Sequence, residues 1–136
     1  MKNLVLILLS FLLCLSCKKA VEKAQEKAVV ESITNGFWKV ALFQKGPNDV
    51  TPGFSAYKFQ FKENNTVDAY KNSTVEKTGS WEGNALAMTI TSSFGNAPEP
   101  LFLLNGIWKI TKNSLTRVEA NQTVSGEQYV LHLVKE

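Results

Sequence analysis

The chain has 136 residues, of which 44% are hydrophobic and 20% charged, so its composition excludes a collagen-like or disordered protein and fits one globular domain. Its formal net charge is +3, but residues 36–136 carry only +1, because the first 35 residues hold the remaining +2. A nearly neutral body lacks the basic surface that nucleic-acid binding requires, so we expect no nucleic-acid partner.

The first element in chain order is an export signal over residues 1–16. Lys2 supplies the positive charge, and the apolar run over residues 4–15 is too short to span a membrane. The run ends in Leu13-Cys14-Leu15-Ser16-Cys17, which resembles a bacterial lipobox although Cys14 stands where that motif usually has Leu. The resemblance implies cleavage before Cys17 and lipidation of Cys17, which makes the membrane an expected partner. The alternative is an ordinary secretory signal.

Residues 17–35 are expected to form a tether between this anchor and the body. Lys18 and Lys19 favour anionic lipid headgroups. Lipoproteins of this kind that reach the cell surface often carry an acidic run after the modified Cys. Because none follows Cys17, the resemblance implies an outer-membrane lipoprotein that faces the periplasm. Alanines at every fourth position allow a weak helix, but an isolated helix of this length is marginal in water. A solvated spacer that frays is therefore the preferred interpretation.

Beyond Gly36 the apolar pattern has a period of two, which is typical of β-strands. Eight strands are predicted, over residues 37–43, 55–62, 66–71, 75–82, 86–90, 101–110, 115–120 and 128–135. Their connections are short, which favours an antiparallel up-and-down meander, and eight strands can close into a barrel. The predicted fold class is all-β, with the signal peptide at 1–16, the lipidated Cys and tether at 17–35 and the barrel at 36–136.

Each of the three tryptophans follows a glycine by two residues, in Gly36-Phe37-Trp38, Gly79-Ser80-Trp81 and Gly106-Ile107-Trp108. In a strand such a pair shares a face, and we expect the ring to fill the space that the glycine leaves. The first motif resembles the lipocalin signature. Residues 36–136 resemble lipocalin-like lipoproteins of Bacteroidetes, also through residues 59–67 and 108–115. The resemblance implies a lipocalin-like barrel and, because most members are uncharacterised, no particular ligand.

The interior of this barrel is the candidate site for a small hydrophobic ligand. The residues expected to line it are Trp38, Val40, Tyr57, Phe59, Phe61, Met88, Leu103 and Trp108. The two longest loops, residues 44–54 and 92–100, are expected to form the mouth of the site. So many large rings in short strands also allow a filled interior, so the alternative is a structural or protein-interaction lipoprotein without a small ligand.

Arg117 is the single arginine of the chain. In lipocalins the first-strand tryptophan packs against an arginine from a late strand, so the resemblance suggests that Arg117 closes one end of the barrel over Trp38 or Trp108. Arginine also stacks on aromatic rings better than lysine does. A surface pair with Glu119 or Glu76 is nevertheless the preferred interpretation.

Reactive side chains are too few to predict an enzyme. The single histidine, His132, alternates with Leu131 and Leu133, so we expect it to face the solvent. The carboxylates are scattered without metal-ligand spacing, and no glycine-rich phosphate loop is present. We therefore predict a monomeric protein without a cofactor, a metal or catalytic residues.

Overall fold

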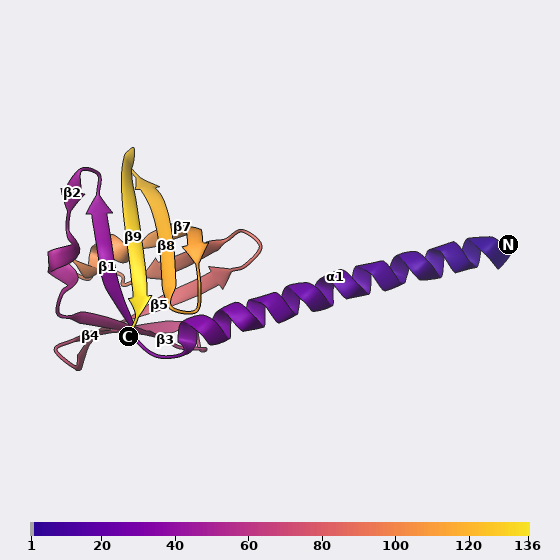
Figure 1. Cartoon of the computed structure of the whole chain (residues 1–136), viewed down its shortest axis with the longest axis horizontal. Helices are drawn as coiled ribbons and strands as arrows, with labels where there is room; N and C mark the ends of the chain where they lie inside the picture. The colour runs from indigo at the N-terminus through magenta and orange to yellow at the C-terminus, as the bar shows by residue number, and fades with distance from the viewer. Residues whose placement is uncertain (1) are drawn as a thin grey trace.

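The computed structural model describes the backbone of residues 2–136 and the side chains of residues 17–136. Helix α1, Lys2–Thr34, leads into a compact β-barrel (Figure 1). The strands are β1 (Trp38–Lys45), β2 (Asn48–Asp49), β3 (Tyr57–Phe61), β4 (Thr66–Lys71), β5 (Thr74–Asn84), β6 (Thr89–Ser93), β7 (Gly106–Asn113), β8 (Arg117–Val124) and β9 (Glu127–Lys135). Two short 3₁₀ helices, η1 (Thr51–Phe54) and η2 (Leu101–Leu104), lie in the long loops.

The predicted signal peptide, residues 1–16, lies outside the residues whose side chains the structure describes. Within the described part of the chain, no helix has both the length and the apolar character needed to cross a membrane.

The sheet is an antiparallel meander from β3 to β9, and it closes because β1 pairs with β9. That pairing extends from Trp38 opposite Lys135 to Lys45 opposite Tyr129. On its other side β1 meets β3 only where Trp38 lies opposite Phe59, and β2 adds a short ladder to the end of β1. The prediction of an eight-stranded antiparallel up-and-down barrel is therefore confirmed, with β2 as an accessory strand.

The antiparallel order gives the barrel two different ends. The helix end is the end at which α1 joins the barrel. It carries the hairpin turns at residues 62–65, 85–88 and 114–116. The loop end carries the two long connections, residues 46–56 and 94–105, and therefore both 3₁₀ helices. The two loops that were predicted to form a mouth thus lie at the same end, opposite α1.

Two of the predicted strands are corrected by the structure, and β1 contains an irregularity. Residues 101–104 form η2 rather than the first half of a strand, so β7 begins only at Gly106. Residues 85–88 form the turn between β5 and β6, and Met88 adopts a positive φ of 52° there. A β-bulge in β1 between Val40 and Leu42 moves Leu42 to the face of His132 and turns Phe43 into the core, where it is fully buried.

The last turn of α1 is part of the barrel core. Ile33 is 4% exposed. The Trp38 indole N–H donates to the Ile33 carbonyl oxygen at 2.9 Å, and Lys135 Nζ donates to the Ser32 carbonyl oxygen at 2.8 Å. Carbonyls in a last helical turn lack partners within the helix, so the barrel caps the helix through these two side chains. The expected fraying spacer is thus replaced at this turn by a docked helix.

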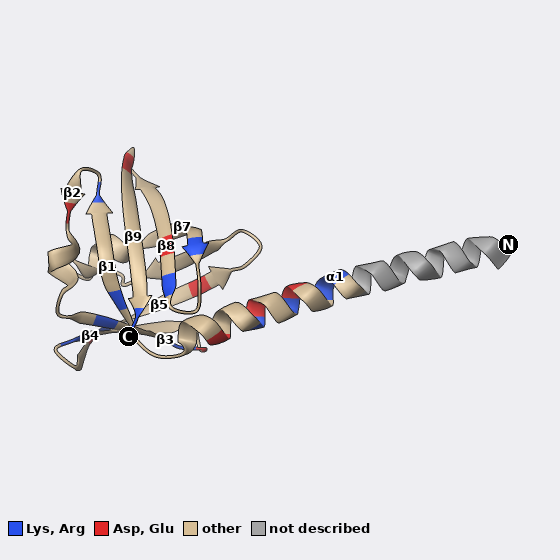
Figure 2. Cartoon of the chain, in the orientation of Figure 1, with Lys and Arg blue, Asp and Glu red and all other residues tan. Residues whose placement is uncertain are grey.

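Residues 17–28 of the same helix are exposed, and their lysines and glutamates alternate along it (Figure 2). Among the helix residues whose side chains are described, 17–34, the one ion pair joins Lys27 to Glu31, at 3.8 Å with both side chains largely exposed. Such a pair adds little stability, so tertiary contacts of the last turn, rather than local pairing, hold the helix to the barrel.

The three Gly-x-Trp motifs share a hydrogen bond. The indole N–H groups of Trp38, Trp81 and Trp108 donate at 2.9 Å to the carbonyl oxygens of Ile33, Lys62 and Leu104. All three rings are buried, so each donor needs such a partner.

The tryptophan was expected to fill the space beside the glycine of its own motif. At Gly79 and Gly106 residues from neighbouring segments fill that space instead. A Cβ on Gly79 would lie 2.5 Å from the Ser93 carbonyl oxygen and 2.8 Å from the ring of Phe94. At Gly106, where φ is +123°, it would lie 2.3 Å from the side-chain oxygen of Gln122. In these two motifs a neighbouring segment thus approaches the glycine closely, and the indole two residues later is held by its hydrogen bond.

Candidate functional site

The interior of the barrel contains one small cavity of about 40 Å³ in the described part of the chain. Its walls are almost entirely apolar: Phe59, Phe61, Val67, Ile90, Ser92, Phe94, Leu104, Trp108, Val118, Ala120, Leu131 and Leu133. Ligand pockets usually measure about 300–1,000 Å³. The interior is therefore nearly filled by side chains and has no room for a lipid-sized molecule.

Aromatic rings close the loop end. Phe43 stacks on Phe54 of η1 with ring centroids 5.3 Å apart, and it meets the edge of Trp108 at 5.7 Å. Phe94 of the second loop packs against Phe59, with ring centroids 6.1 Å apart. Phe54 and Phe94 are each 2% exposed, so both long loops fold inward and pack on the strands. The predicted mouth between these loops is therefore absent: the loops close the barrel.

A larger hollow of about 300 Å³ lies at the helix end, between α1 and the β7–β8 hairpin. We call it the helix-end groove, and it is lined by Ala28, Val29, Ser32, Ile33, Trp38, Ile90, Ile110, Asn113, Ser114, Leu115 and Val118. Its floor is apolar, and the polar groups belong to Ser32, Asn113 and Ser114. Ile90 and Val118 line both this groove and the interior cavity, so the two hollows share a wall.

The predicted lining residues are distributed over different places. Phe59, Phe61 and Trp108 line the interior cavity, and Trp38 lines the helix-end groove. Val40 is partly buried against the core, and Leu103 is buried on η2 without lining either hollow. Met88 is 37% exposed in the β5–β6 turn, so the structure places it outside the barrel interior.

Tyr57 is buried at the loop end, where its hydroxyl donates to a carboxylate oxygen of Glu76. Burial and this carboxylate both disfavour the phenolate, so the pKa of Tyr57 is raised, whereas the hydrogen bond lowers the pKa of Glu76. Lys71 Nζ lies 5.4 Å from the centre of the same ring. The neutral phenol is thus held as a structural donor.

Arg117 does not stack on a tryptophan. Its Nε donates to Glu119 Oε1 at 2.6 Å, and Nη2 lies 3.2 Å from His132 Nδ1 on the outer face of β8 and β9. The Arg117 hydrogen bond is the main reason that the pKa of Glu119 is lowered. The surface pair with Glu119 is the arrangement found, and His132 faces outward as expected.

The cation over Trp38 is instead Lys135, whose Nζ lies 4.9 Å from the ring centre. Lys135 stands opposite Trp38 in the β1–β9 pairing, so the closure of the barrel brings the two together. A lysine from the last strand, rather than Arg117, therefore lies over the first-strand tryptophan.

Val29, Ile33 and Leu115 of the helix-end groove were not predicted as site residues, and the sequence carries a signal for the first two. Val29 and Ile33 are spaced by one helical turn immediately before the first Gly-x-Trp motif, which is a pattern typical of a buried helix face. Leu115 gave no such signal, because an apolar residue in a hairpin turn is read as the start of the next strand. Within residues 17–136, no three His, Cys, Asp or Glu side chains are grouped to hold a metal ion.

The comparisons with known proteins concern the fold. The structure resembles the crystal structure of a DUF4847 family protein from Bacteroides vulgatus, with a TM-score of 0.55, and the match covers 79% of this chain and 97% of that chain. No family profile and no curated protein matches the sequence. At 15% sequence identity the likeness shows the fold alone. The barrel therefore has a fold that also occurs in a Bacteroides protein of the DUF4847 family.

Proposed function

We propose that this chain is a lipid-anchored protein of the bacterial envelope whose lipocalin-like barrel binds a small hydrophobic ligand in the helix-end groove. The observation that carries the proposal is the groove itself: a hollow of about 300 Å³ with an apolar floor and three polar side chains at its edge. This combination of an apolar cleft with few polar groups is the usual form of a small-molecule site. The role is binding rather than catalysis.

The anchor is supported by the lipobox-like sequence that ends at Cys17 and by the position of that residue. Cys17 is exposed on α1, and the helix between it and the barrel is solvated. Lys18 and Lys19 follow directly and suit a membrane surface. We place the monomeric protein in the outer membrane with its barrel in the periplasm.

A second function is favoured by a different observation. The interior cavity of about 40 Å³ is too small for a ligand, as expected of a filled barrel that acts through its surface on a partner protein. In that case the helix-end groove would stay empty of small molecules in the cell.

Two measurements separate these functions. Native mass spectrometry of protein purified from its own envelope should show an additional small hydrophobic mass, and the protein should take up a fluorescent fatty acid. The matched variants are Ala28→Trp, which places an indole in the groove, and Ala24→Trp, which places one on the exposed helix outside it. We expect at least tenfold weaker uptake in the first variant and unchanged uptake in the second.

Absence of both a bound mass and uptake in the native protein would contradict ligand binding and favour the filled-core alternative. The intact mass of the same sample tests the anchor, because cleavage and acylation at Cys17 change it by the lost signal peptide and the added acyl groups.

A further inference from the structure

Two leucines at the helix end are unusually exposed. Leu115 is 74% exposed at the tip of the β7–β8 hairpin, and Leu86 is 71% exposed in the β5–β6 turn. They are the most exposed large hydrophobic side chains in the described part of the chain, and Met88, also in the β5–β6 turn, is 37% exposed. Hairpin turns normally carry polar residues, so apolar side chains at two neighbouring tips indicate a surface that contacts something apolar.

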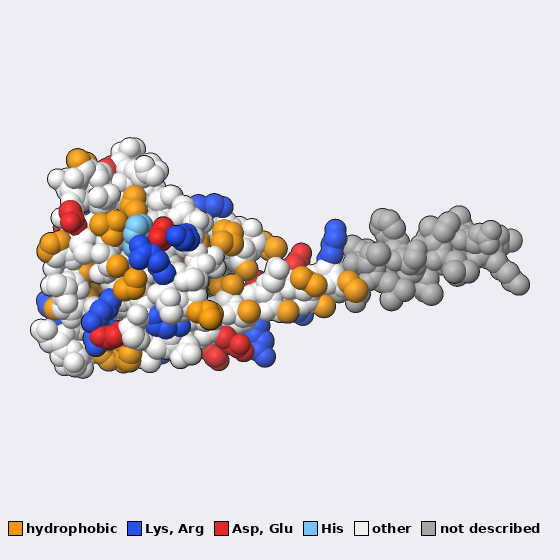
Figure 3. Space-filling view, in the orientation of Figure 1, with side chains coloured by type: hydrophobic (Ala, Val, Ile, Leu, Met, Phe, Trp, Pro, Cys, Tyr) orange, Lys and Arg blue, Asp and Glu red, His pale blue; other side chains and the backbone are white. Residues whose placement is uncertain are grey.

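These tips flank the root of α1. The β5–β6 hairpin projects in the same direction as the helix, and the β7–β8 turn lies beside the helix root (Figure 1). Hydrophobic side chains continue along the visible side of the helix onto the adjoining part of the barrel (Figure 3). On the helix, Val21 is 57% exposed. We call the surface formed by Val21, Leu86, Met88 and Leu115 the helix-side face; it borders the helix-end groove.

The position of the anchor identifies what covers this face. Cys17 precedes Ile33 by 16 residues, which is about 24 Å along a helix. A lipid on Cys17 therefore tethers the barrel from the side of the helix-side face, within about 24 Å of the anchor, whereas the loop end lies on the far side of the barrel. This step rests on the lipid anchor of the proposed function.

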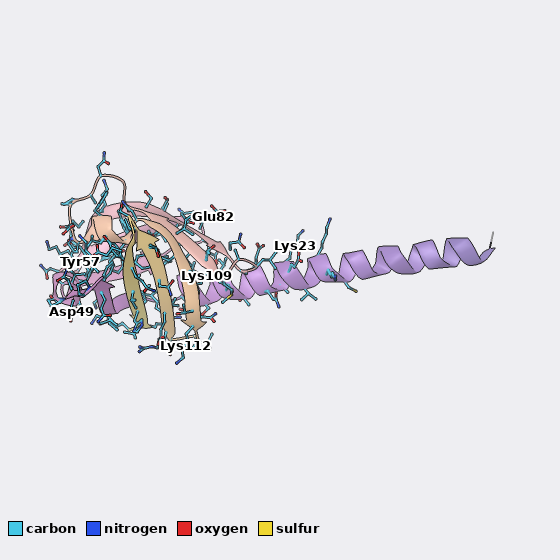
Figure 4. All side chains as sticks on the ribbon, turned by 90° about the horizontal axis from the view of Figure 1, so that it is seen from above. Lys23, Asp49, Tyr57, Glu82, Lys109 and Lys112 are labelled. Carbon is cyan, nitrogen blue, oxygen red and sulfur yellow. The ribbon has the colours of Figure 1, made fainter. Side chains whose placement is uncertain are left out.

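Charged side chains around the face suit the same partner. Lys109 Nζ donates to the Ala87 carbonyl oxygen at 2.8 Å and so lies against the β5–β6 tip, and Lys112 lies near the β7–β8 tip. Both lie toward the helix in Figure 4, as does Lys23 on the helix itself, whereas Asp49 and Tyr57 are at the opposite side. Glu82 also lies toward the helix, so attraction to anionic headgroups is modest and apolar contact carries most of the binding.

We propose that the helix-side face is a membrane-contact surface. The exposed part of α1 lies along the bilayer, Leu86 and Leu115 insert between lipids, and Lys109 and Lys112 meet the headgroups. The helix-end groove then opens at the membrane, so that its ligand is an acyl chain taken from the bilayer.

The test uses the full lipidated protein, bound by its own anchor to vesicles of phosphatidylethanolamine and phosphatidylglycerol. A fluorophore is attached to Leu86→Cys, to Leu115→Cys, or to the controls Phe102→Cys and Ile107→Cys. The controls are also exposed, by 52% and 64%, but Phe102 lies on η2 at the loop end and Ile107 lies at the start of β7, next to that end. Nitroxide-labelled lipids should quench the two helix-end labels at least threefold more than the two controls.

A charge in the face should weaken the contact. Leu86→Glu should abolish most of the quenching of the label at position 115, whereas Ile107→Glu should leave it unchanged. Equal, low quenching at all four positions on protein that floats with the vesicles would overturn the membrane-contact surface and leave the anchor intact. Failure of the protein to float, with no acyl mass on Cys17, would instead refute the anchor and, with it, this inference.

Discussion

The side chain of Lys135 joins three parts of the molecule. Its ammonium lies over the Trp38 ring at 4.9 Å and donates to the Ser32 carbonyl oxygen at 2.8 Å, while its backbone belongs to β9. A cation at this place interacts favourably with the ring and with the carbonyl end of a helix. One lysine therefore couples α1, the first strand and the last strand.

Replacing Lys135 by Met keeps an unbranched apolar stem and removes the ammonium. We expect a shift in tryptophan emission and a loss of about 1 kcal/mol in the free energy of unfolding. The reason is that the partly buried hydrogen bond to the Ser32 carbonyl oxygen and the cation over Trp38 both disappear. Arg117→Met is the matched control, because Arg117 contacts Glu119 and His132 and no tryptophan. An emission change with Arg117→Met and none with Lys135→Met would show that the roles of the two cations are reversed.

At the scale of the element, α1 has two different parts. Residues 17–28 are exposed, whereas Ile33 is 4% exposed among the core residues of the barrel. The last turn of the helix is thus a structural part of the barrel, although it precedes the first strand. The folding unit accordingly begins within the segment that the sequence assigns to the tether.

Truncating Ile33 to Ala should lower the free energy of unfolding by about 2–4 kcal/mol, because a buried isoleucine loses apolar contacts and leaves a cavity. Val21→Ala on the exposed part of the same helix should change it by less than about 0.5 kcal/mol. Urea unfolding followed by far-UV circular dichroism of the barrel measures both. Equal, small effects would mean that the barrel folds without the helix.

At the scale of the whole molecule, the described side chains nearly fill the interior of the barrel and leave a small cavity there. The gap of about 40 Å³ is close to the volume of one or two methyl groups, and Ala120 borders it. Ala69, on β4, is fully buried and does not border it. The two alanines therefore differ in whether a larger side chain finds room.

We expect Ala120→Val to raise the free energy of unfolding by about 1 kcal/mol, since each buried methylene contributes about 0.8 kcal/mol. Ala69→Val should lower it by about 1–3 kcal/mol through overpacking. Thermal unfolding of both variants provides the comparison. Stabilisation by Ala69→Val, or destabilisation of similar size by both, would contradict a gap at Ala120.

The strand pattern could be predicted from sequence where polar and apolar residues alternate clearly, as in β4, whose bounds match. The sequence pattern could not distinguish a strand from the turn at Met88 or from η2, because a short apolar run has no periodicity that separates these structures. The candidate site was predicted in the interior because inward-facing rings are visible in the sequence. The helix-end groove was not predictable in this way, since it depends on how Ile33 docks and where the Leu115 turn lies relative to α1.

The pairing of β1 with β9 also determines when the protein can fold. A chain that emerges from a ribosome or a translocation channel releases β1 first and β9 last, so β1 keeps an unpaired edge until the C-terminal strand appears. The contact between Ser32 and Lys135, 103 residues apart in sequence, is available only at that point. Barrel closure therefore follows the emergence of β9, and until then the unpaired edge of β1 is the part of the barrel most in need of protection from aggregation.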